Sequence, residues 1–279
     1  MEDHAIKQSV IDGYGKLAKS QSGGLMSKLF ACCNLNGTQV KVAEKNGYTQ
    51  EEMDLAPEAS NLGVGCGNPN ALTKISKGET VVDLGSGAGF DAFITARHVG
   101  DGGKVIGIDL SDDMLKLAKK NAVQGKYTNV EFLKGDIEDL PLEDNLADHV
   151  ISNCVINLSL NKDKVYKEAY RILKSSGRIS ISDIVLEREL PDFVRDSLVG
   201  HLACVAGAEK LDTYLEYIRD AGFVDVRVES KTGFPLEIMM TDPQIIKIAS
   251  IMNFSMNSAD AKDIASRVSS ISLTASKPK

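Results

Sequence analysis

A glycine-rich turn between an apolar strand and a helix constrains the fold of this chain more than any other feature. The segment Thr80-Val-Val-Asp-Leu84 has the short apolar pattern of a buried strand and runs directly into Gly85-Ser-Gly-Ala-Gly89. A helical pattern begins at Asp91. Because glycine has no side chain and adopts backbone conformations that other residues avoid, such a turn lets the backbone approach a ligand closely. The segment predicts a ligand-binding strand–turn–helix unit.

The chain around this turn alternates between short apolar runs and helical patterns. Further strands are predicted over residues 104–109, 129–134, 147–152, 177–185, 224–229 and 269–275, and helices over 3–20, 91–99, 111–124, 162–173, 211–221, 242–252 and 259–268. Residues 21–40 and 58–70, rich in Gly, Ser, Asn or Pro, are expected to form loops. Apolar strands separated by helices favour an α/β fold with a doubly wound, mostly parallel seven-stranded sheet covered on both faces.

Composition and charge exclude several classes of partner. The 279-residue chain has 32 Lys and Arg against 39 Asp and Glu, and this net charge of −7 disfavours binding to a nucleic acid. No run of about 18 apolar residues exists that would span a membrane. The polar first residues, Met1-Glu-Asp-His-Ala-Ile-Lys7, are unlike a secretory leader. We therefore expect a cytoplasmic monomer that uses neither a nucleic acid nor a membrane as partner.

Two acidic residues at the ends of neighbouring strands extend the predicted ligand site. The turn departs from the dinucleotide pattern G-x-G-x-x-G, because Phe90 stands at its sixth position, so a ligand without a pyrophosphate fits better. Asp109 ends the second strand, where a carboxylate can accept both hydroxyls of a ribose. Asp136 follows the third strand, at the height of an adenine amino group. Each acid alone would be read as a solvated loop residue, but together with the turn they predict a nucleoside site.

Three of the five cysteines fall close to this predicted site. Cys66 stands between glycines in an irregular loop, Cys154 follows the fourth strand, and Cys204 lies on an expected helix after the fifth. A single cysteine is more often a small buried apolar residue than a ligand, so the interpretation depends on their joint placement. They lack the paired spacing of a zinc ribbon. Because soft atoms prefer sulfur ligands, the three thiols together predict a thiol-seeking substrate.

Several segments resemble a known family. Asp83-Leu-Gly-Ser-Gly-Ala-Gly-Phe-Asp91, Gly107-Ile-Asp-Leu-Ser111 and Gly135-Asp-Ile-Glu-Asp-Leu-Pro141 are similar to the cofactor motifs of class I S-adenosylmethionine-dependent methyltransferases. Within that superfamily, the segments around the cysteines at 61–69, 152–158 and 204–208 resemble arsenite methyltransferases. The resemblance implies a Rossmann-like core that binds S-adenosylmethionine over residues 71–185. It implies that residues 1–70 form an N-terminal helical lid with cysteine-bearing loops. It also implies that residues 186–279 hold an arsenic-binding helix region, the last strands of the sheet and a C-terminal excursion of helices and a strand.

The resemblance also implies roles for individual residues. It implies that trivalent arsenic is bound by Cys66, Cys154 and Cys204, and that Cys32 or Cys33 takes part in a disulfide step. For these last two, the alternative of ordinary loop thiols stays open. The implied cofactor contacts are Asp83, Gly85, Ser86, Gly87, Gly89, Asp109, Leu110, Met114, Asp136, Ile137, Asn153 and Tyr14. For Asn153 and Tyr14, a strand-end cap and a packing contact are the alternatives.

The implied reaction transfers a methyl group from S-adenosylmethionine to arsenic bound by thiolates and leaves S-adenosylhomocysteine. The arsenic lone pair carries no proton, so no general base is required. Each transfer formally removes two electrons from arsenic, which implies a thiol reductant such as thioredoxin or glutathione. Two alternatives remain open. One is C- or O-methylation of a quinone or another small metabolite, and the other is a non-catalytic thiol trap for arsenic or antimony.

Overall fold

The computed structural model describes residues 3–21, 35–192, 205, 207–233 and 259–279 of the chain. Its strands are β1 (Thr80–Leu84), β2 (Lys104–Asp109), β3 (Val130–Lys134), β4 (Ala147–Asn153), β5 (Leu173–Leu186), β6 (Val224–Gly233) and β7 (Val268–Ser276). Its helices are α1 (Asp3–Gln21), α3 (Leu35–Lys45), α4 (Gln50–Asp54), α5 (Phe90–Val99), α6 (Asp112–Gln124), α7 (Lys162–Ile172), α10 (Leu211–Asp220) and α13 (Ala259–Ser266), with short 3₁₀ turns at Glu58–Ser60, Pro69–Ala71 and Ile156–Leu158.

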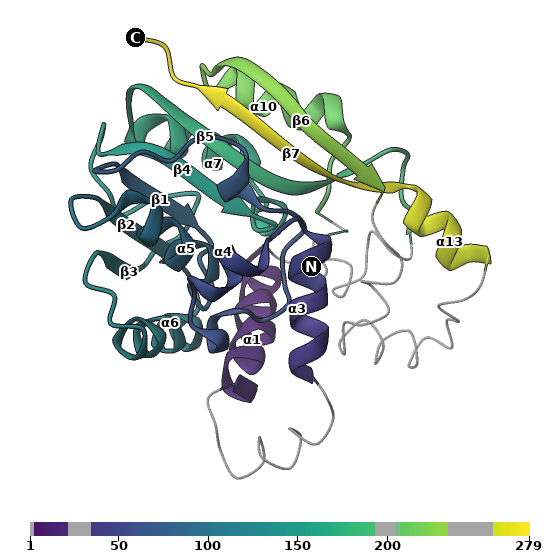
Figure 1. Cartoon of the computed structure of the whole chain (residues 1–279). Helices are drawn as coiled ribbons and strands as arrows, with labels where there is room; N and C mark the ends of the chain where they lie inside the picture. The colour runs from purple at the N-terminus through teal and green to yellow at the C-terminus, as the bar shows by residue number, and fades with distance from the viewer. Residues whose placement is uncertain (1–2, 22–34, 193–204, 206, 234–258) are drawn as a thin grey trace.

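The seven strands of the described residues form one sheet, in the order β3-β2-β1-β4-β5-β7-β6 (Figure 1). The pairs from β3 to β5 are parallel, and β7 is antiparallel to both β5 and β6. The predicted doubly wound, mostly parallel sheet is therefore confirmed. The strand order reverses between β1 and β4, and in open α/β sheets a ligand binds outside the carboxyl ends of the strands at such a point.

The period-two pattern of the strands builds a core on each face of the sheet. Along β1, Val81 packs in a cluster with Phe93 of α5 and Leu115 of α6, whereas the next residue, Val82, packs with α7 and α10 on the opposite face. Both faces of the sheet are therefore covered at its centre, which explains why β1, β2 and β4 are mostly buried and apolar.

Helix α1 packs across α6, near the carboxyl ends of β2 and β3 (Figure 1). Ala18 of α1 lies in one apolar cluster with Met114 and Leu117 of α6. Ser111 caps the start of α6, since its side chain accepts a hydrogen bond from the Met114 N–H. Within the described ranges, no helix is long and apolar enough to span a membrane.

The structure differs from the predictions in several places. Residues 35–40, expected in a loop, begin helix α3, because Val42 and Ala43 further along it are buried and Ala43 packs against Tyr48 and Ile94. Helix α4, which has a capping box between Thr49 and Glu52, was not predicted. Strands β5 and β6 are longer than expected, since β5 starts at residue 173 and β6 continues to residue 233. The helix expected over 242–252 lies outside the described residues.

The sheet core can be tested with one chemical change at two sites. Val150 of β4 is 0% exposed, whereas Val123 of α6 is 79% exposed. We expect Val150→Ala to lower the free energy of unfolding by about 2 kcal/mol, because it removes buried methyl groups and leaves a small void. Val123→Ala should change it by no more than about 0.5 kcal/mol, because alanine favours a helix. Urea unfolding of both variants checks this, and equal losses would contradict the assigned core.

Candidate active site

The glycine-rich turn after β1 adopts backbone conformations that favour glycine. The φ angles are +69° at Gly85, +52° at Gly87 and +93° at Gly89. A Cβ on Gly85 would lie 2.3 Å from the Val155 side chain, and one on Gly89 would lie 2.7 Å from the Phe132 ring. A Cβ on Gly87 would meet nothing within 4 Å. Two glycines are therefore needed for packing, and the middle one faces open space that a ligand can approach.

Three carboxyl groups, those of Asp83, Asp91 and Asp109, surround this turn. Asp83 and Asp91 are buried and Asp109 is half-buried, and burial raises the pKa of each, most strongly for Asp83. No Lys or Arg of the described ranges forms an ion pair with any of them. The Asp83 Oδ2 and Ser86 Oγ atoms are buried and have no hydrogen-bond partner among the described residues. Such a set of acids suits a ligand that carries positive charge and hydrogen-bond donors.

Asp109 is held by the backbone of the turns on either side of it. Its Oδ2 accepts the Gly87 N–H at 2.9 Å, and its Oδ1 accepts the Ser111 N–H at 2.8 Å. The carboxylate therefore has a fixed orientation beside the glycine-rich turn. A carboxylate has about four acceptor positions, so further donors can still bind it.

The remaining predicted cofactor residues lie around α1 and the ends of β2 and β3. Asp136 accepts a hydrogen bond from Lys7 of α1 at 2.9 Å. Tyr14 packs in the same apolar cluster as Met114, which is 1% exposed. Ile137 is buried and Leu110 is half-buried. These contacts place the N-terminal helix beside the predicted nucleoside site.

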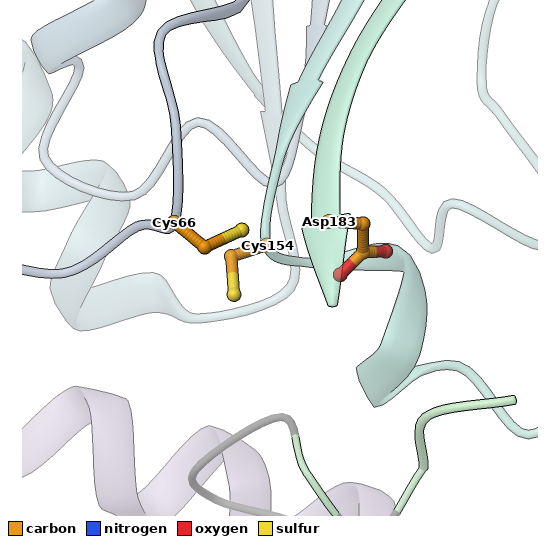
Figure 2. Close-up of side chains that lie close together, drawn as sticks. All are labelled: Cys66, Cys154 and Asp183. Atoms are coloured by element: carbon orange, nitrogen blue, oxygen red, sulfur yellow. The ribbon is translucent and has the colours of Figure 1, made fainter. Parts of the chain in front are cut away.

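Two of the predicted arsenic ligands come together at the carboxyl ends of the strands. The sulfurs of Cys66 and Cys154 and a carboxylate oxygen of Asp183 all lie within 4.8 Å of one another (Figure 2). Cys154 has a φ of +59°, a conformation rare for residues other than glycine that is often found at functional sites. Its N–H donates to the Ser182 carbonyl of β5 at 2.8 Å. The other predicted site cysteines, Cys32, Cys33 and Cys204, lie outside the described residues.

The loop that carries Cys66 is fixed by the side chain of Asn153, at the end of β4. Asn153 Oδ1 accepts the Cys66 N–H at 3.0 Å and lies 3.9 Å from the Cys66 sulfur. Its Nδ2 donates to the Gly67 carbonyl at 2.8 Å. The Cys66 carbonyl in turn accepts a hydrogen bond from the Ser270 hydroxyl of β7. The amide of Asn153, predicted as a cofactor contact, is thus bonded to the cysteine loop on both of its polar atoms.

A buried network of hydrogen bonds holds the side chain of Asn153, and the sequence analysis did not predict it. Asp91 Oδ1 accepts hydrogen bonds from the Tyr48 hydroxyl at 2.6 Å and from Asn70 Nδ2 at 2.8 Å, while its Oδ2 accepts from Asn153 Nδ2 at 3.1 Å. Burial raises the Asp91 pKa to about 6, although its three donors oppose this shift. The one sequence feature that could have indicated this network is the position of Asp91 at the end of the glycine-rich motif.

Asp183 is a second buried acid near the cysteines that the sequence analysis did not single out. It is fully buried near the end of β5, and burial raises its pKa to about 6. The register pairs Asn153 of β4 with Ser182 of β5, which brings the residues that follow them, Cys154 and Asp183, together beyond the end of β4. The polar pair Ser182-Asp183 inside an apolar strand was the signal that could have found it.

The raised pKa of Asp91 predicts a pH-dependent stability. Between about pH 4 and pH 6 the folded chain retains a proton on Asp91 that the unfolded chain releases, so the contribution of Asp91 to stability falls as the pH rises through this window. Relative to Asp91→Asn, the wild type should therefore lose stability from pH 4 to pH 7. Urea unfolding across this range measures the difference, with Asp101→Asn, at an exposed acid, as the control for loss of a charge. A difference in unfolding free energy between the wild type and Asp91→Asn that stays constant from pH 4 to pH 7 would contradict a raised pKa of Asp91.

Comparisons with known proteins agree with the motifs. A family model described as a methyltransferase domain matches residues 75–222. An arsenite methyltransferase from Halobacterium salinarum is 42% identical over 203 residues, which are 72% of this chain and 51% of that protein. Another, from Aquipseudomonas alcaligenes, is 35% identical over 230 residues, 80% of this chain and 63% of that protein. This chain therefore spans about half to two thirds of the length of these relatives.

A solved structure extends the likeness to three dimensions. The crystal structure of an arsenic(III) S-adenosylmethionine methyltransferase from Chlamydomonas reinhardtii aligns with a TM-score of 0.62 and 31% identity, over 86% of this chain and 73% of that one. The sequence match, the fold and the solved relative all indicate the same group of proteins. The chain belongs to the arsenite methyltransferase family of class I S-adenosylmethionine-dependent methyltransferases, as its motifs predicted.

Proposed function

We propose that this protein transfers methyl groups from S-adenosylmethionine to trivalent arsenic held by cysteine thiolates. The observation that carries the proposal is the meeting of the Cys66 and Cys154 sulfurs at the end of the sheet where the glycine-rich turn also opens. Methyl transfer to carbon, nitrogen or oxygen gives no reason for two sulfurs at this position. Trivalent arsenic does, because a soft centre prefers sulfur ligands.

The residues around the glycine-rich turn fit S-adenosylmethionine. When bound, this cofactor supplies an electrophilic methyl group on a positively charged sulfonium. Asp83 and Asp91 are buried without a basic partner among the described residues, so a cationic ligand would offset their charge. Asp109 would accept hydrogen bonds from the ribose hydroxyls, and Gly87, which has no side chain, would leave room for the cofactor. Helix α1, through Tyr14 and Lys7, would cover the adenosine side.

The cysteines would present arsenic as the nucleophile. Cys66, Cys154 and Cys204 bind it as thiolates in a three-legged pyramid, which leaves the arsenic lone pair free at the apex. Binding releases protons, because a thiol with a pKa near 8.5 must lose its proton to become a ligand. No side chain has to remove a proton in the methyl transfer itself. The arsenic lone pair would form a bond to the methyl carbon as the carbon–sulfonium bond breaks, and S-adenosylhomocysteine would be the leaving group.

Catalysis would then come from position rather than from acid–base chemistry. Holding the two reactants in line contributes up to roughly 7–11 kcal/mol in favourable cases. Here Asn153 fixes the backbone of Cys66, and the Ser182 carbonyl fixes that of Cys154. The backbone of both arsenic-binding cysteines is therefore held in place before the substrate arrives.

Turnover would require an external thiol reductant. Each transfer oxidises arsenic by two electrons in the formal count, and a reductant of the thioredoxin or glutathione class returns it to the trivalent state. Cys32 or Cys33 would pass electrons through a disulfide. As methyl groups replace sulfur ligands, fewer thiolates hold the arsenic, so mono- and dimethylated arsenicals are the natural products.

The reaction is tested by arsenic speciation. The full-length protein is incubated with arsenite, S-adenosylmethionine and a thiol reductant, and the products are separated by chromatography with mass detection. We expect methylated arsenic from the wild type and about 100-fold less or none from Cys154→Ser, because the acceptor loses its position. Wild-type arsenite binding without methylated product would instead indicate a thiol trap. Neither binding nor product would indicate a carbon or oxygen methyltransferase.

A second variant distinguishes the S-adenosylmethionine site from the arsenic site. We expect Asp109→Asn to weaken S-adenosylmethionine binding by about 10- to 100-fold, because each hydrogen bond to a charged group contributes roughly 1.5–3 kcal/mol. Its arsenite affinity should stay at the wild-type value, since Asp109 lies at the glycine-rich turn. Calorimetric titration with each ligand measures both, and Asp101→Asn is the control at an exposed acid. Loss of arsenite affinity alone would contradict the assignment.

A further inference from the structure

The methyl-transfer scheme gives no role to Asp183, although its carboxylate lies within 4.8 Å of both cysteine sulfurs (Figure 2). We propose that Cys66, Cys154 and Asp183 form a three-ligand site for a borderline-soft divalent cation, best fitted by Zn²⁺, and that this cation competes with trivalent arsenic for the two sulfurs. The competition rests on the proposed function, whereas the binding of the cation does not.

The ligand set matches the preferences of zinc. Zn²⁺ binds cysteine sulfur at about 2.3 Å and carboxylate oxygen at about 2.0–2.2 Å in a tetrahedral arrangement. This geometry places neighbouring ligand atoms about 3.5–3.8 Å apart. The observed limit of 4.8 Å therefore requires each atom to move by about 1 Å or less. Three protein ligands would leave the fourth position for water, as in sites where zinc keeps an exchangeable ligand.

The carboxylate of Asp183 is already oriented by outer partners. Its Oδ1 accepts hydrogen bonds from Asn157 Nδ2 at 2.9 Å and from the Ile184 N–H at 2.8 Å, and its Oδ2 accepts from the Tyr214 hydroxyl at 2.8 Å. These bonds use three of the about four acceptor positions of a carboxylate, which leaves one for a cation. Metal-binding carboxylates characteristically have such outer-shell hydrogen bonds, which hold them in position.

Charge and burial favour a cation over an empty cluster. Asp183 and Cys66 are buried and Cys154 is half-buried, so ionising these groups without a counter-charge is costly. Lys162 contributes positive charge that favours the Asp183 carboxylate, but its ammonium donates to the Ser159 carbonyl at 3.2 Å. A divalent cation would compensate two thiolates and release their protons on binding.

Arsenic and zinc differ in how they use this cluster. Trivalent arsenic is soft and takes sulfur, so it has no need of Asp183, whereas zinc accepts sulfur and carboxylate oxygen together. The contribution of Asp183 therefore distinguishes the two ligands. The variant Asp183→Asn removes the charged oxygen ligand at nearly constant volume. The variant Asp183→Cys replaces it with another zinc ligand.

The test is calorimetric titration of reduced full-length protein with ZnCl₂ and, separately, with arsenite. We expect Asp183→Asn to weaken zinc binding by about 100-fold or more, since even the loss of an outer-shell partner costs 10- to 100-fold. Asp183→Cys should restore it. Arsenite affinity should change by less than threefold in Asp183→Asn, and zinc should inhibit methylation in the wild type far more than in this variant. Circular dichroism melting confirms that both variants fold.

Three results would overturn the site. These are a wild type that does not bind zinc, an Asp183→Asn variant that binds zinc as the wild type does, and an Asp183→Cys variant that stays as weak as Asp183→Asn. The last result would mean that Asp183 only supports the fold. A protein that shows the expected zinc pattern but produces no methylated arsenic in zinc-free buffer would leave the cation site standing and reject the proposed function alone.

Discussion

The hydrogen bonds of the Asn153 amide are the interaction on which the candidate site depends. They join the end of β4 to the loop of Cys66, and so bring together two cysteines that are distant in the sequence. The same amide is bonded to Asp91, which lies in the first turn of α5 after the glycine-rich turn. One side chain therefore connects the expected substrate ligands to the expected cofactor loop. In the proposed reaction, this connection would hold the two reactants in a fixed relation.

The buried acids show that the site is not arranged for stability alone. Asp83, Asp91 and Asp183 are all buried, and burial raises the pKa of each. An unpaired buried carboxylate costs free energy that the surrounding hydrogen bonds only partly offset. Groups with pKa values shifted in this way cluster at functional sites. In this protein they lie where a cationic cofactor and a thiol-seeking substrate would meet.

The sequence predicted the sheet well because its signals are local. Each core strand is an apolar run, and the glycines of the turn follow β1 directly, so pattern and spacing were sufficient. The meeting of Cys66 with Cys154 was predicted from the loop and strand end they occupy and from the family resemblance. Helix α3 was not predicted, because packing of Ala43 against the core outweighs a polar composition. Contacts made only in the folded chain, such as Tyr48 with Asp91, leave no local pattern.

Arsenic X-ray absorption tests the central claim most directly, because it counts the sulfur and oxygen atoms bound to arsenic. The measurement compares arsenite-loaded full-length protein with the Cys66→Ser variant. The account predicts a shell of sulfur alone in the wild type and the appearance of oxygen in the variant. An oxygen-only shell in the wild type, or identical spectra for the two proteins, would contradict a substrate site built on Cys66 and Cys154.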